Sequence, residues 1–523
     1  MMPELQAYNI SYRFDNGETL FENLSCSLTQ RRVGLVGRNG IGKSLLASII
    51  SGERLPSSGT VTPPNSYAVY SQQASELLDS ELSIAEYLGV SQVLTAINNI
   101  ESGDCDGKWF EIVGEQWHLP ALLAQQLLKL GLPQDPNFPC AKLSGGQLAR
   151  IQLWQLLKSD MQLLILDEPS NHLDESAKQW LINAIDNFAG TVLLISHDRT
   201  LLREMNEIWE LSRTGLNVYG GNYDFYAEQK QTELLAIERQ LAQLNKAQKK
   251  LATQAQLNRE KAEQRAAQGN RLRRGGSQSK ILLDFKKGKA SASTASRNKS
   301  AQARQRQLQS QTQELSQKHE QNSPQKLHIA TQQSSSHKAI SILDGVLPFG
   351  NQQSIALQVF ANNKFHLKGC NGSGKSTLLK VILGEVPLTQ GELMVNTPVY
   401  YLDQHFGVIQ DELSMLTNIM TLCEGMTETD ARTLLAGIGF RRDTVYRIGR
   451  ELSGGEKMKL AVLVISHQAH QPFLLLDEPD NHLDLASKKM LAKALCDYNG
   501  GFVLISHDSD FAKESGVSCE YRL

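Results

Sequence analysis

The sequence predicts two copies of one α/β domain joined by a basic helical hairpin, and three observations carry this prediction. Four short motifs occur twice in the same order, and the last two recur at an identical spacing of 310 residues. The apolar runs that precede these motifs are typical of buried parallel strands. Between the copies, leucines at heptad spacing lie in a segment with a large excess of positive charge. A chain of 523 residues is long enough for such an arrangement.

Composition excludes several classes of protein. The formal net charge is only -2, which does not fit a uniformly basic nucleic-acid coat. No apolar run approaches the ~20 residues that a membrane helix needs, and the polar start, Met1 to Phe14, lacks the apolar core of a signal peptide. Seven scattered cysteines form no C-x-x-C pair, which favours free thiols over metal ligands or disulfides. We therefore expect a cytoplasmic protein.

The first repeated motif is a glycine-rich loop, Gly37 to Ser44, which recurs as Gly369 to Ser376. Its pattern, G-x-x-x-x-G-K-[ST], is that of a P-loop, whose backbone N–H groups and lysine hold phosphates and whose hydroxyl can bind Mg²⁺. The residues expected to contact a nucleotide are Gly37, Asn39, Gly40, Gly42, Lys43 and Ser44 in the first copy and Gly369, Asn371, Gly372, Gly374, Lys375, Ser376 and Thr377 in the second.

The next strand-like runs end in acidic residues. Leu163 to Pro169 recurs as Phe473 to Pro479, and each run leads into an Asp-Glu pair. We expect Asp167 and Asp477 to bind Mg²⁺ through water, and Glu168 and Glu478 to orient and polarise an attacking water molecule. The two runs that follow end at His197 and His507, at the height where a γ-phosphate would lie, so these histidines are candidate phosphate sensors.

A Leu-Ser-Gly-Gly motif occurs before each Asp-Glu pair, at Ser144, Gly145 and Gly146 and again at Ser453, Gly454 and Gly455. The two glycines allow the backbone to approach an anion, and the helix that they open directs its dipole at that anion. Such a loop has no partner within its own P-loop domain. We therefore expect it to act on the nucleotide held by the other copy.

In this order, the motifs resemble the nucleotide-binding domains of ATP-binding cassette (ABC) proteins. Two such domains in one chain, without membrane spans and with a long charged linker, resemble the ABC-F family of ribosome-associated ATPases. Asn171 to Asp174, Asn481 to Asp484 and Gly221 to Tyr226 add to the resemblance. It implies two P-loop ABC-type domains that hydrolyse ATP with Mg²⁺ to ADP and phosphate, paired within one monomer.

The resemblance also implies two ATP sites between head-to-tail domains. Site one would join Lys43, Ser44, Gln73, Asp167, Glu168 and His197 to Ser453, Gly454 and Gly455. Site two would join Lys375, Ser376, Gln404, Asp477, Glu478 and His507 to Ser144, Gly145 and Gly146. Gln73 and Gln404 match a glutamine that senses the metal, with Gln72 as a competing assignment for the first.

Two features depart from the family pattern or fit it poorly. Ser170 and Asp480 stand where the family usually has threonine, and Asp480 adds a negative charge near the phosphates of site two. Phe14 is the candidate for stacking on adenine in the first copy, with Tyr12 as the alternative. In the second copy Phe349 lies closer to its P-loop and its surroundings match poorly, so no stacking residue is assigned there.

The two copies differ in length, because the P-loops are 332 residues apart, whereas the Asp-Glu and histidine motifs are only 310 apart. We place the roughly 22 extra residues in an enlarged helical subdomain at 74–142, which includes a helical stretch from Leu119 to Leu130. The predicted domains are residues 1–227 and 333–523, with a linker at 228–332.

The linker is predicted to be a helical hairpin. Leu234, Ile237, Leu241, Leu244 and Leu251 occupy heptad positions, Gln248 is the one polar break, and a helix of about 38 residues would run ~57 Å. From Glu228 to Lys326, 21 Lys and Arg face 8 Asp and Glu, a local charge of +13. The tip residues expected to bind RNA are Arg271, Arg273, Arg274, Lys280, Lys286, Lys287 and Lys289, with Phe285 able to stack on a base.

For function, the resemblance implies an ATPase that binds the ribosome and modulates translation, with the linker tip near tRNA and the peptidyl-transferase centre. Either a general translation factor or a protein that protects ribosomes from antibiotics would fit. Alternatives are the ATPase subunit of an ABC transporter, which leaves the charged hairpin unexplained, and a DNA-associated ABC ATPase.

Overall fold

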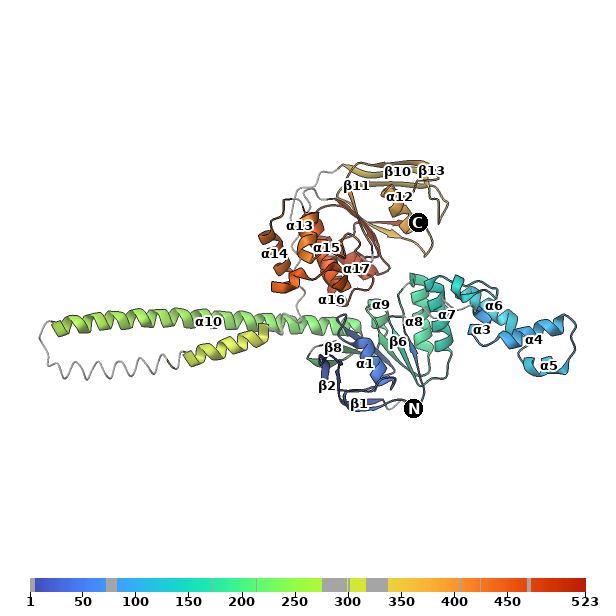
Figure 1. Cartoon of the computed structure of the whole chain (residues 1–523), viewed down its shortest axis with the longest axis horizontal. Coiled ribbons are helices and arrows are strands. Elements are labelled where there is room, and N and C mark those ends of the chain that lie inside the picture. Colours follow the sequence, from blue (N-terminus) through green and yellow to red (C-terminus); the bar gives the residue numbers. More distant parts are fainter. Residues whose placement is uncertain are drawn as a thin grey trace. The chain divides into compact units, whose positions relative to one another are not determined.

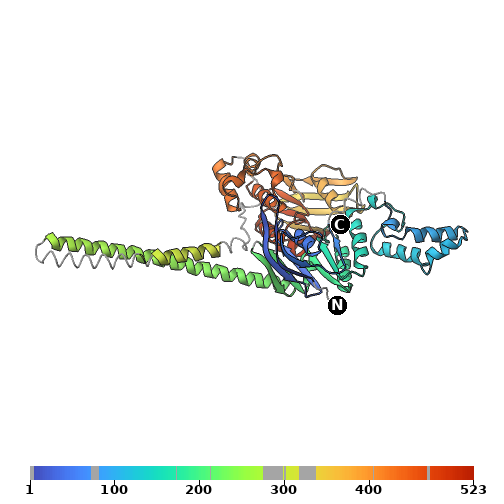
Figure 2. The same cartoon turned by 60° about the horizontal axis from the view of Figure 1, so that its bottom comes forward.

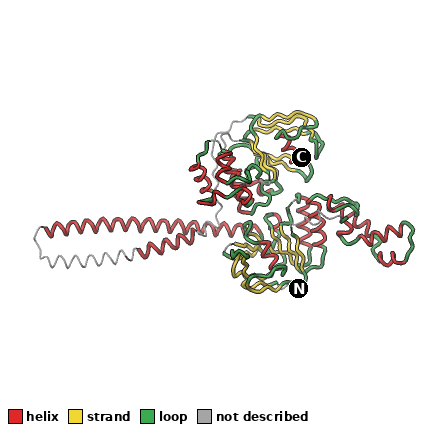
Figure 3. Tube along the Cα trace, viewed as in Figure 1, coloured by secondary structure: helices red, strands yellow, loops and turns green. Residues whose placement is uncertain are grey.

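A computed structural model of the chain describes residues 5–71, 82–171, 173–212, 214–274, 299, 302–316, 337–403, 406–423, 425–467 and 472–523. The chain divides into two compact units. Met1–Tyr226 and Gln325–Leu523 form the first unit, which contains both copies of the repeat, and Ala227–Pro324 forms the second, which is the linker. In Figure 3 the strands, in yellow, all belong to the repeated domains, and the described part of the linker is helical.

The first domain combines a six-stranded sheet with a three-stranded antiparallel sheet (Figure 1). The larger sheet has the strand order β5-β6-β7-β3-β8-β9, in which only β9 pairs antiparallel. The smaller has the order β2-β1-β4. The bounds are β1 (Gln6–Arg13), β2 (Thr19–Ser27), β3 (Arg32–Gly37), α1 (Lys43–Ile50), β4 (Ser58–Thr62), β5 (Tyr67–Tyr70), η1 (Cys140–Lys142), α7 (Gly145–Leu157), β6 (Leu163–Asp167), α8 (Glu175–Asn187), β7 (Thr191–Ile195), α9 (Arg199–Arg203), β8 (Glu207–Ser212) and β9 (Gly215–Gly220).

The central strands explain where the motifs meet. Strands β6 and β7 are buried along their apolar length, as expected for a parallel sheet covered on both faces. Asp167 ends β6, Gly37 ends β3, and His197 follows β7 by two residues. Since these strands are parallel neighbours, their carboxyl ends lie at one edge of the sheet, which is where ligands bind in such folds.

The predicted helical insert lies between β5 and α7. Its described part contains α3 (Ile84–Tyr87), α4 (Ser91–Glu101), α5 (Gly107–Val113) and α6 (Leu119–Lys129), the last over the stretch expected to be helical. Helices α3 and α6 share a small apolar core with the start of α7, and α4 and α5 enclose a second one around Val113. The insert is therefore anchored to the helix that begins at the first Leu-Ser-Gly-Gly motif.

The second domain repeats the topology of the first. Its parallel sheet has the order β14-β15-β16-β12-β17, which matches β5-β6-β7-β3-β8 strand for strand, and β11-β10-β13 matches β2-β1-β4. The predicted duplication is thus a duplication of structure. The bounds are β10 (Lys338–Val346), β11 (Ile355–Phe360), β12 (Lys364–Lys368), α12 (Lys375–Ile382), β13 (Gln390–Val395), β14 (Val399–Leu402), α13 (Met415–Leu422), α14 (Glu428–Gly437), η2 (Arg442–Tyr446), η3 (Gly449–Glu451), α15 (Gly454–Ser466), β15 (Phe473–Asp477), α16 (Leu485–Asp497), β16 (Phe502–Ile505), α17 (Ser509–Glu514) and β17 (Cys519–Arg522).

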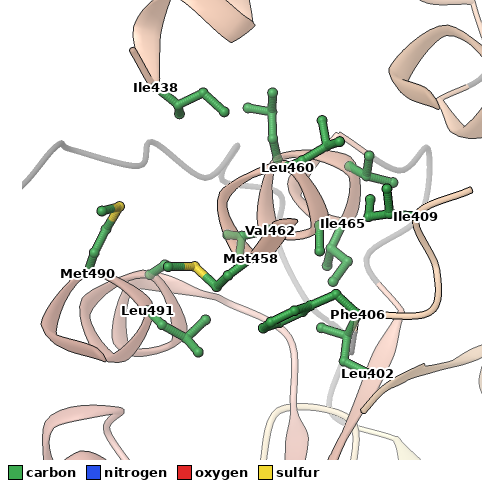
Figure 4. Packing of buried hydrophobic residues seen from close by; sticks show 14 of the residues in the cluster. Leu402, Phe406, Ile409, Ile438, Met458, Leu460, Val462, Ile465, Met490 and Leu491 are labelled. Atoms are coloured by element: carbon green, nitrogen blue, oxygen red, sulfur yellow. The ribbon is translucent and has the colours of Figure 1, made fainter. Parts of the chain in front are cut away.

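The largest apolar core lies in the second domain behind α15. Figure 4 shows Phe406, Met458 and Leu491 converging from the loop after β14, from α15 and from α16. Met458 is fully buried and Phe406 nearly so. Because close-packed side chains resist displacement, this core holds the helix that begins at the second Leu-Ser-Gly-Gly motif in a fixed orientation.

The linker helix is longer than predicted. Helix α10 spans Tyr223–Arg274, 52 residues rather than about 38, so it would extend ~78 Å. It begins inside the Gly221 to Tyr226 run rather than after it, because Tyr223 and Tyr226 are buried in the first domain and already adopt helical conformation there. The heptad pattern located the leucine-bearing part of the helix and missed its aromatic first turn and its polar C-terminal end.

Residues 302–316 form a second linker helix that runs beside α10 (Figure 2). The Gln248 side-chain amide donates to the Leu308 carbonyl oxygen at 3.2 Å and to the Thr312 hydroxyl at 2.8 Å. Gln248, the one polar break in the heptad pattern, therefore joins the two helices by hydrogen bonds. Of the predicted tip, Arg271 lies in the last turn of α10, Arg273 and Arg274 are described by their backbone alone, and Lys280, Lys286, Lys287, Lys289 and Phe285 lie outside the described residues.

Candidate nucleotide sites

Both P-loops have the backbone that their glycines predict. Gly40 and Gly42 have φ values of 76° and 99°, and Gly372 and Gly374 have values of 81° and 101°, a region that other residues rarely adopt. A Cβ at Gly42 would lie 2.5 Å from a Leu20 methyl carbon, whereas one at Gly40 would meet no atom within 4 Å. Gly42 thus permits close packing against Leu20, and Gly40 faces open space. The loops fit a nucleotide.

The P-loop lysines are buried and bound to their own loops. Lys43 Nζ donates to the carbonyl oxygens of Gly37 at 2.9 Å and Arg38 at 3.3 Å, and Lys375 Nζ donates to those of Gly369 and Cys370 at 2.8 and 2.9 Å. Burial lowers the pKa of both ammonium groups, and the neighbouring Glu168 and Glu478 carboxylates act against this. A phosphate would supply the negative charge that a buried lysine requires.

The Asp-Glu pairs follow the buried strands β6 and β15. Glu168 and Glu478 have φ values of 48° and 50°, a strained backbone for a residue other than glycine, which is a feature found at functional sites. Their backbone N–H groups donate to the Ile195 and Ile505 carbonyl oxygens at 2.8 and 2.9 Å. Each hydrogen bond joins the glutamate to the strand that leads to the histidine, so the two motifs are fixed to each other.

The predicted metal ligands also lie together. The Ser44 hydroxyl is hydrogen-bonded to Asp167, and the Ser376 hydroxyl is hydrogen-bonded to Asp477. Burial raises the pKa of both aspartates, and a hard divalent cation would offset the cost of burying their negative charge. Hydroxyl and carboxylate oxygens are ligands that Mg²⁺ accepts, so the site fits that ion. Gln73, its competitor Gln72, and Gln404 lie outside the described residues.

At site one, His197 closes a contact with the P-loop. Its Nε2 lies 3.0 Å from Lys43 Nζ, 3.1 Å from Asn39 Oδ1 and 3.6 Å from Glu168 Oε1. Burial and the Lys43 charge hold the pKa of His197 well below its usual range, so the imidazole is neutral. Burial raises the pKa of Glu168 to about 7, and its Oε1 accepts no hydrogen bond from the described residues.

At site two, His507 faces the glutamate instead. Its Nε2 lies 3.3 Å from Glu478 Oε1, and the Asn481 amide donates to the other carboxylate oxygen of Glu478. These partners hold the pKa of Glu478 below its usual range despite burial. The Tyr401 hydroxyl donates to Asp477 Oδ2 at 3.1 Å, whereas Val69 has the corresponding register in the first domain.

The two domains contact each other beside both P-loops. At site one, the Asn39 backbone N–H donates to Asp484 Oδ2 at 3.1 Å and its side chain donates to the His482 carbonyl oxygen at 2.7 Å. At site two, Asp174, Ser176 and Gln179 of the first domain line a cavity of about 770 Å³ together with Gly369 and Lys375. Each P-loop therefore faces the segment that follows the Asp-Glu-Pro motif of the other domain.

The Leu-Ser-Gly-Gly turns are built as helix starts. Ser144 and Ser453 cap α7 and α15 in capping boxes with Gln147 and Glu456. The two glycines of each motif, Gly145–Gly146 and Gly454–Gly455, are therefore the first residues of their helix. Helix α15 brings Lys459 close enough to Arg38 of the first P-loop for the two charges to repel. At the first P-loop, however, it is His482 and Asp484 of the second domain that accept hydrogen bonds from Asn39, so direct contact by Ser453 stays a prediction.

The candidate adenine-stacking residues are exposed aromatics. Phe14 is 39% exposed and packs edge-on against Tyr12, its alternative, at 5.5 Å between ring centroids. Phe349 is 71% exposed, and its carbonyl oxygen lies beside Gly374. Since Asn351 also donates its backbone N–H to Ser373, the segment around Phe349 borders the second P-loop more closely than its sequence context indicated.

Two lysines of the interface were missed in the sequence. Lys178 on α8 and Lys488 on α16 are nearly buried and lie beside the histidine turns. They occur at the same 310-residue spacing as the recognised motifs, so an alignment of the two copies beyond the motifs would have identified them. Lysines on the helices of a domain are normally solvent-exposed, so the residue type alone did not mark these two as buried.

Comparisons with known proteins agree with this geometry. A family profile described as "ABC transporter" matches residues 21–171 and 352–481. The chain is 30% identical to the ATP-binding protein YdiF of Bacillus subtilis over 97% of this chain and 78% of that one, and 28% identical to "ABC transporter F family member 5" of Arabidopsis thaliana over 95% and 72%. A solved structure described as a complex of "archaeal ribosomal stalk protein aP1 and archaeal ribosome recycling factor aABCE1" has the same fold, with a TM-score of 0.54, 16% identity and coverage of 97% and 86%. Among the described residues, no helix has the length and apolar character to cross a membrane.

Proposed function

Because this chain belongs to the ABC transporter family, in its ABC-F branch, and is an ATP hydrolase, we propose that it acts on the ribosome in the cytoplasm as a monomer. ATP and Mg²⁺ bind at sites one and two, and the cycle of binding and hydrolysis directs the linker hairpin toward ribosomal RNA and tRNA. The tip then lies near the peptidyl-transferase centre, where it modulates translation or displaces an antibiotic.

The observation that carries the proposal is the segregation of charge. The linker segment from Glu228 to Lys326 has a net charge of +13, so the rest of the chain must carry about -15. A helical hairpin with this charge is suited to the phosphate backbone of RNA, since each neutralised phosphate releases counterions. The function of an ABC transporter subunit does not explain a linker hairpin with this positive charge.

At each site, the described side chains can perform the steps of ATP hydrolysis. Lys43 and Lys375 would hold the β- and γ-phosphates, and Asp167 and Asp477 would hold the metal with Ser44 and Ser376. Glu168 and Glu478 would polarise the attacking water, and His197 and His507 would contact the γ-phosphate. The P-loop of each domain faces the other domain, so nucleotide bound there would draw the two together.

The base of the linker is connected to the nucleotide sites by Arg203. This residue lies on α9, directly after the His197 turn, and its guanidinium binds Asp224 in the first turn of α10 at 3.1 Å. It also binds Asp510 at 2.6 Å, on the helix α17 that follows His507. A movement of either histidine turn would therefore reach the start of the linker helix.

The relatives support the proposal in two ways. The solved structure with the same two-domain fold is described as a ribosome recycling factor bound to a ribosomal stalk protein, and one relative is named for the F branch of the family. At 16% identity, the similarity to the solved structure is evidence for the fold alone. The proposal for this chain therefore depends on the linker charge and on the contact between Arg203 and α10.

Co-sedimentation with ribosomes tests the proposal. A protein with both Glu168→Gln and Glu478→Gln should bind ATP without hydrolysing it, and should migrate with ribosomes through a sucrose gradient in the presence of ATP but not ADP. It should also arrest growth when expressed. If the ATP-loaded variant stays at the top of the gradient, the proposal is wrong.

A linker variant provides the matched control. Replacing Lys280, Lys286, Lys287 and Lys289 with glutamine should abolish co-sedimentation at physiological salt and leave the ATPase rate without ribosomes unchanged, because these residues are remote in sequence from both sites. Double-stranded DNA and lipid vesicles serve as competitors in the same assay. Tighter binding to DNA than to ribosomes, or pelleting with vesicles, would favour one of the two alternative functions instead.

A further inference from the structure

A series of close polar contacts leads from the second domain to the imidazole of His197. The Asn39 side-chain amide donates from Nδ2 to the His482 carbonyl oxygen at 2.7 Å, and its Oδ1 lies 3.1 Å from His197 Nε2. The Asn39 backbone N–H donates to Asp484 Oδ2 at 3.1 Å. Asn39 and His197 belong to the first domain, whereas His482 and Asp484 belong to the second. One side chain, that of Asn39, therefore separates the second domain from the candidate phosphate sensor of site one.

The contact with His482 determines which way the Asn39 amide faces. A carbonyl oxygen can only accept a hydrogen bond, so the group that meets it is the NH2 of the amide and not the amide oxygen. The amide oxygen then faces His197. Because Asn39 lies at an exposed position of the P-loop, it is the contact with the second domain that holds its amide in this orientation.

The carbonyl oxygen that accepts this hydrogen bond belongs to a strained residue. His482 has a φ of 59°, in the left-handed region that residues other than glycine rarely adopt. Its side chain is exposed, and its peptide carbonyl makes the contact with Asn39. Strained conformations of this kind persist where the surrounding structure needs the backbone group that they direct. The direction of the His482 carbonyl therefore depends on this left-handed conformation.

The Asn39 oxygen in turn selects the tautomer of His197. The imidazole is 6% exposed and its Nε2 lies 3.0 Å from the Lys43 ammonium, so a second positive charge is unfavourable and the ring has a single N–H. An amide oxygen only accepts, so the hydrogen bond with Asn39 requires this N–H at Nε2.

The opposite tautomer would serve Lys43 instead. Nε2 would then accept from the Lys43 ammonium, and the N–H would lie at Nδ1 of His197, which is buried and has no hydrogen-bond partner among the described residues. A buried donor without a partner is costly, and Lys43 already donates to two carbonyl oxygens of its own loop. The Nε2–H tautomer is therefore favoured as long as Asn39 keeps its orientation.

We propose that Asn39 is a positioning residue that keeps the proton of His197 on Nε2, and that the His482 carbonyl of the second domain sets the orientation of Asn39. A histidine with its proton on Nε2 can donate from there to a γ-phosphate oxygen, whereas one whose Nε2 accepts from Lys43 cannot. Site one is therefore ready for the γ-phosphate only while the second domain contacts its P-loop. The inference rests on the γ-phosphate contact proposed above for His197, and it does not depend on the ribosome as partner.

Site two does not depend on the opposite domain in this way. His507 Nε2 lies 3.3 Å from Glu478 Oε1 of its own domain, and a carboxylate favours a proton on the nitrogen that faces it. At site one the equivalent oxygen, Glu168 Oε1, lies 3.6 Å from His197 Nε2, which is beyond hydrogen-bond distance, and Asn39 supplies the acceptor instead.

Nuclear magnetic resonance of the nucleotide-free protein tests the tautomer directly. In a chain labelled with ¹⁵N at histidine, the His197 signals are those lost in His197→Gln, and they should show the proton on Nε2. His482→Val should shift the population toward Nδ1–H, because a β-branched residue does not tolerate the left-handed φ and its carbonyl turns away from Asn39. His482→Asn is the matched control and should keep Nε2–H, because asparagine adopts this conformation more readily. A proton on Nδ1 in the natural chain, or the same tautomer in all three proteins, overturns the proposal.

The rate at site one provides a second measurement. In the Glu478→Gln protein, where site one alone hydrolyses ATP, His482→Val should lower kcat about fivefold and change KM for ATP by less than about twofold, because the histidine donor acts in the chemical step more than in binding. His482→Asn should retain most of kcat. In the Glu168→Gln protein, where site two alone hydrolyses ATP, His482→Val should lower kcat by less than about twofold, since His507 faces Glu478. Equal slowing in both backgrounds would show a general effect on the fold and would contradict the proposal.

Asn39→Ala keeps the test valid if His482→Val does not fold. This change removes the amide between the two domains and leaves the backbone of the second domain as it is. The Nδ1–H tautomer of His197 should then predominate in the nucleotide-free protein. Because Asn39 is also expected to contact the nucleotide, the tautomer and not kcat is the measurement for this variant. A folded Asn39→Ala protein that keeps the His197 proton on Nε2 would refute the role of Asn39.

Discussion

The two nucleotide sites share the P-loop lysine and serine, the Asp-Glu pair and the histidine, but differ in how the glutamate and histidine are used. At site one, His197 turns toward Lys43 and Asn39, and Glu168 keeps one oxygen without a hydrogen-bond donor among the described residues. At site two, His507 lies against Glu478, which also accepts a hydrogen bond from Asn481. The same residues in the same order therefore produce two electrostatic environments.

The difference has a chemical meaning. A general base is most effective when its pKa lies near the working pH, and burial raises the pKa of Glu168 to about 7. Glu478 is held ionised by its partners, so it must release His507 and Asn481 before it can polarise water. We therefore expect site one to be the faster of the two.

The largest expected effect comes from exchanging the two glutamates for glutamine one at a time. Glu168→Gln should lower the steady-state rate of phosphate release about 100-fold from site one and so remove most of the total, because the residue that polarises water is lost. Glu478→Gln should leave more than half of the total rate. Equal losses in the two single variants would show that the sites turn over alike, and the comparison would then be wrong.

Much of this fold could be predicted because it is a repeat. The P-loops, the Asp-Glu pairs and the histidines follow buried apolar strands, and an apolar run that ends at a polar motif is a strong signal even in a single sequence. Recurrence of the motifs in the same order then predicts that the second domain folds like the first, and the strand orders confirm it. The hairpin followed from its leucines and charge.

What the sequence could not predict is set by contacts between distant residues. The Tyr401 bond to Asp477, the turn of His197 toward Lys43 and the burial of Lys488 all depend on packing across strands or domains. The length of α10 was underestimated because its C-terminal end is polar and shows no apolar period. Its first turn is fixed as helix by the burial of Tyr223 in the first domain, which the sequence pattern does not show. The apolar period of a sequence identifies the buried face of a helix, but it does not identify the residues at which the helix begins and ends.

The next largest effect is expected at Arg203, whose contacts have no counterpart among the described residues of the second copy of the repeat. Arg203 joins α17 of the second domain to the first turn of α10 and has Lys513 at the corresponding position of the second copy. Arg203→Ala should weaken ATP-dependent co-sedimentation with ribosomes about fivefold and leave ATP hydrolysis without ribosomes unchanged, because it removes the connection and not the site. Lys513→Ala is the matched control, and equal weakening by both variants would refute a special role for Arg203.

A smaller effect should appear at the metal position of site two. Burial raises the pKa of Asp477, and the Tyr401 hydroxyl acts against this because it donates to the ionised carboxylate. Tyr401→Phe should therefore raise the Mg²⁺ concentration needed for half-maximal hydrolysis about threefold in the Glu168→Gln protein, where site two alone turns over. The same change in the Glu478→Gln protein should have no effect, because Val69 occupies this position at site one. A shift in both backgrounds would mean that Tyr401 acts through the fold.

The smallest effect concerns the pH dependence of stability that a buried histidine gives to the second domain. His366, on the central strand β12, is 2% exposed and its Nε2 donates to the Ser506 carbonyl oxygen at 3.1 Å, whereas the first domain has Gly34 at this position. Burial lowers the pKa of His366, so the unfolded chain binds a proton that the folded domain does not, and stability falls as the pH drops below the unfolded value of about 6.5.

Urea unfolding at pH 5.5 and 7.5 measures this contribution. At pH 7.5 the His366→Leu protein should be less stable than the natural chain, because it lacks the hydrogen bond to Ser506. On acidification its free energy of unfolding should fall less steeply than that of the natural chain, by at most about 1.4 kcal/mol per pH unit. The first domain has Gly34 at this position, so its own transition should not respond to the change. If acid destabilises the variant and the natural chain equally, other buried groups set the acid limit of the second domain, and the difference between the domains lies in their sites alone.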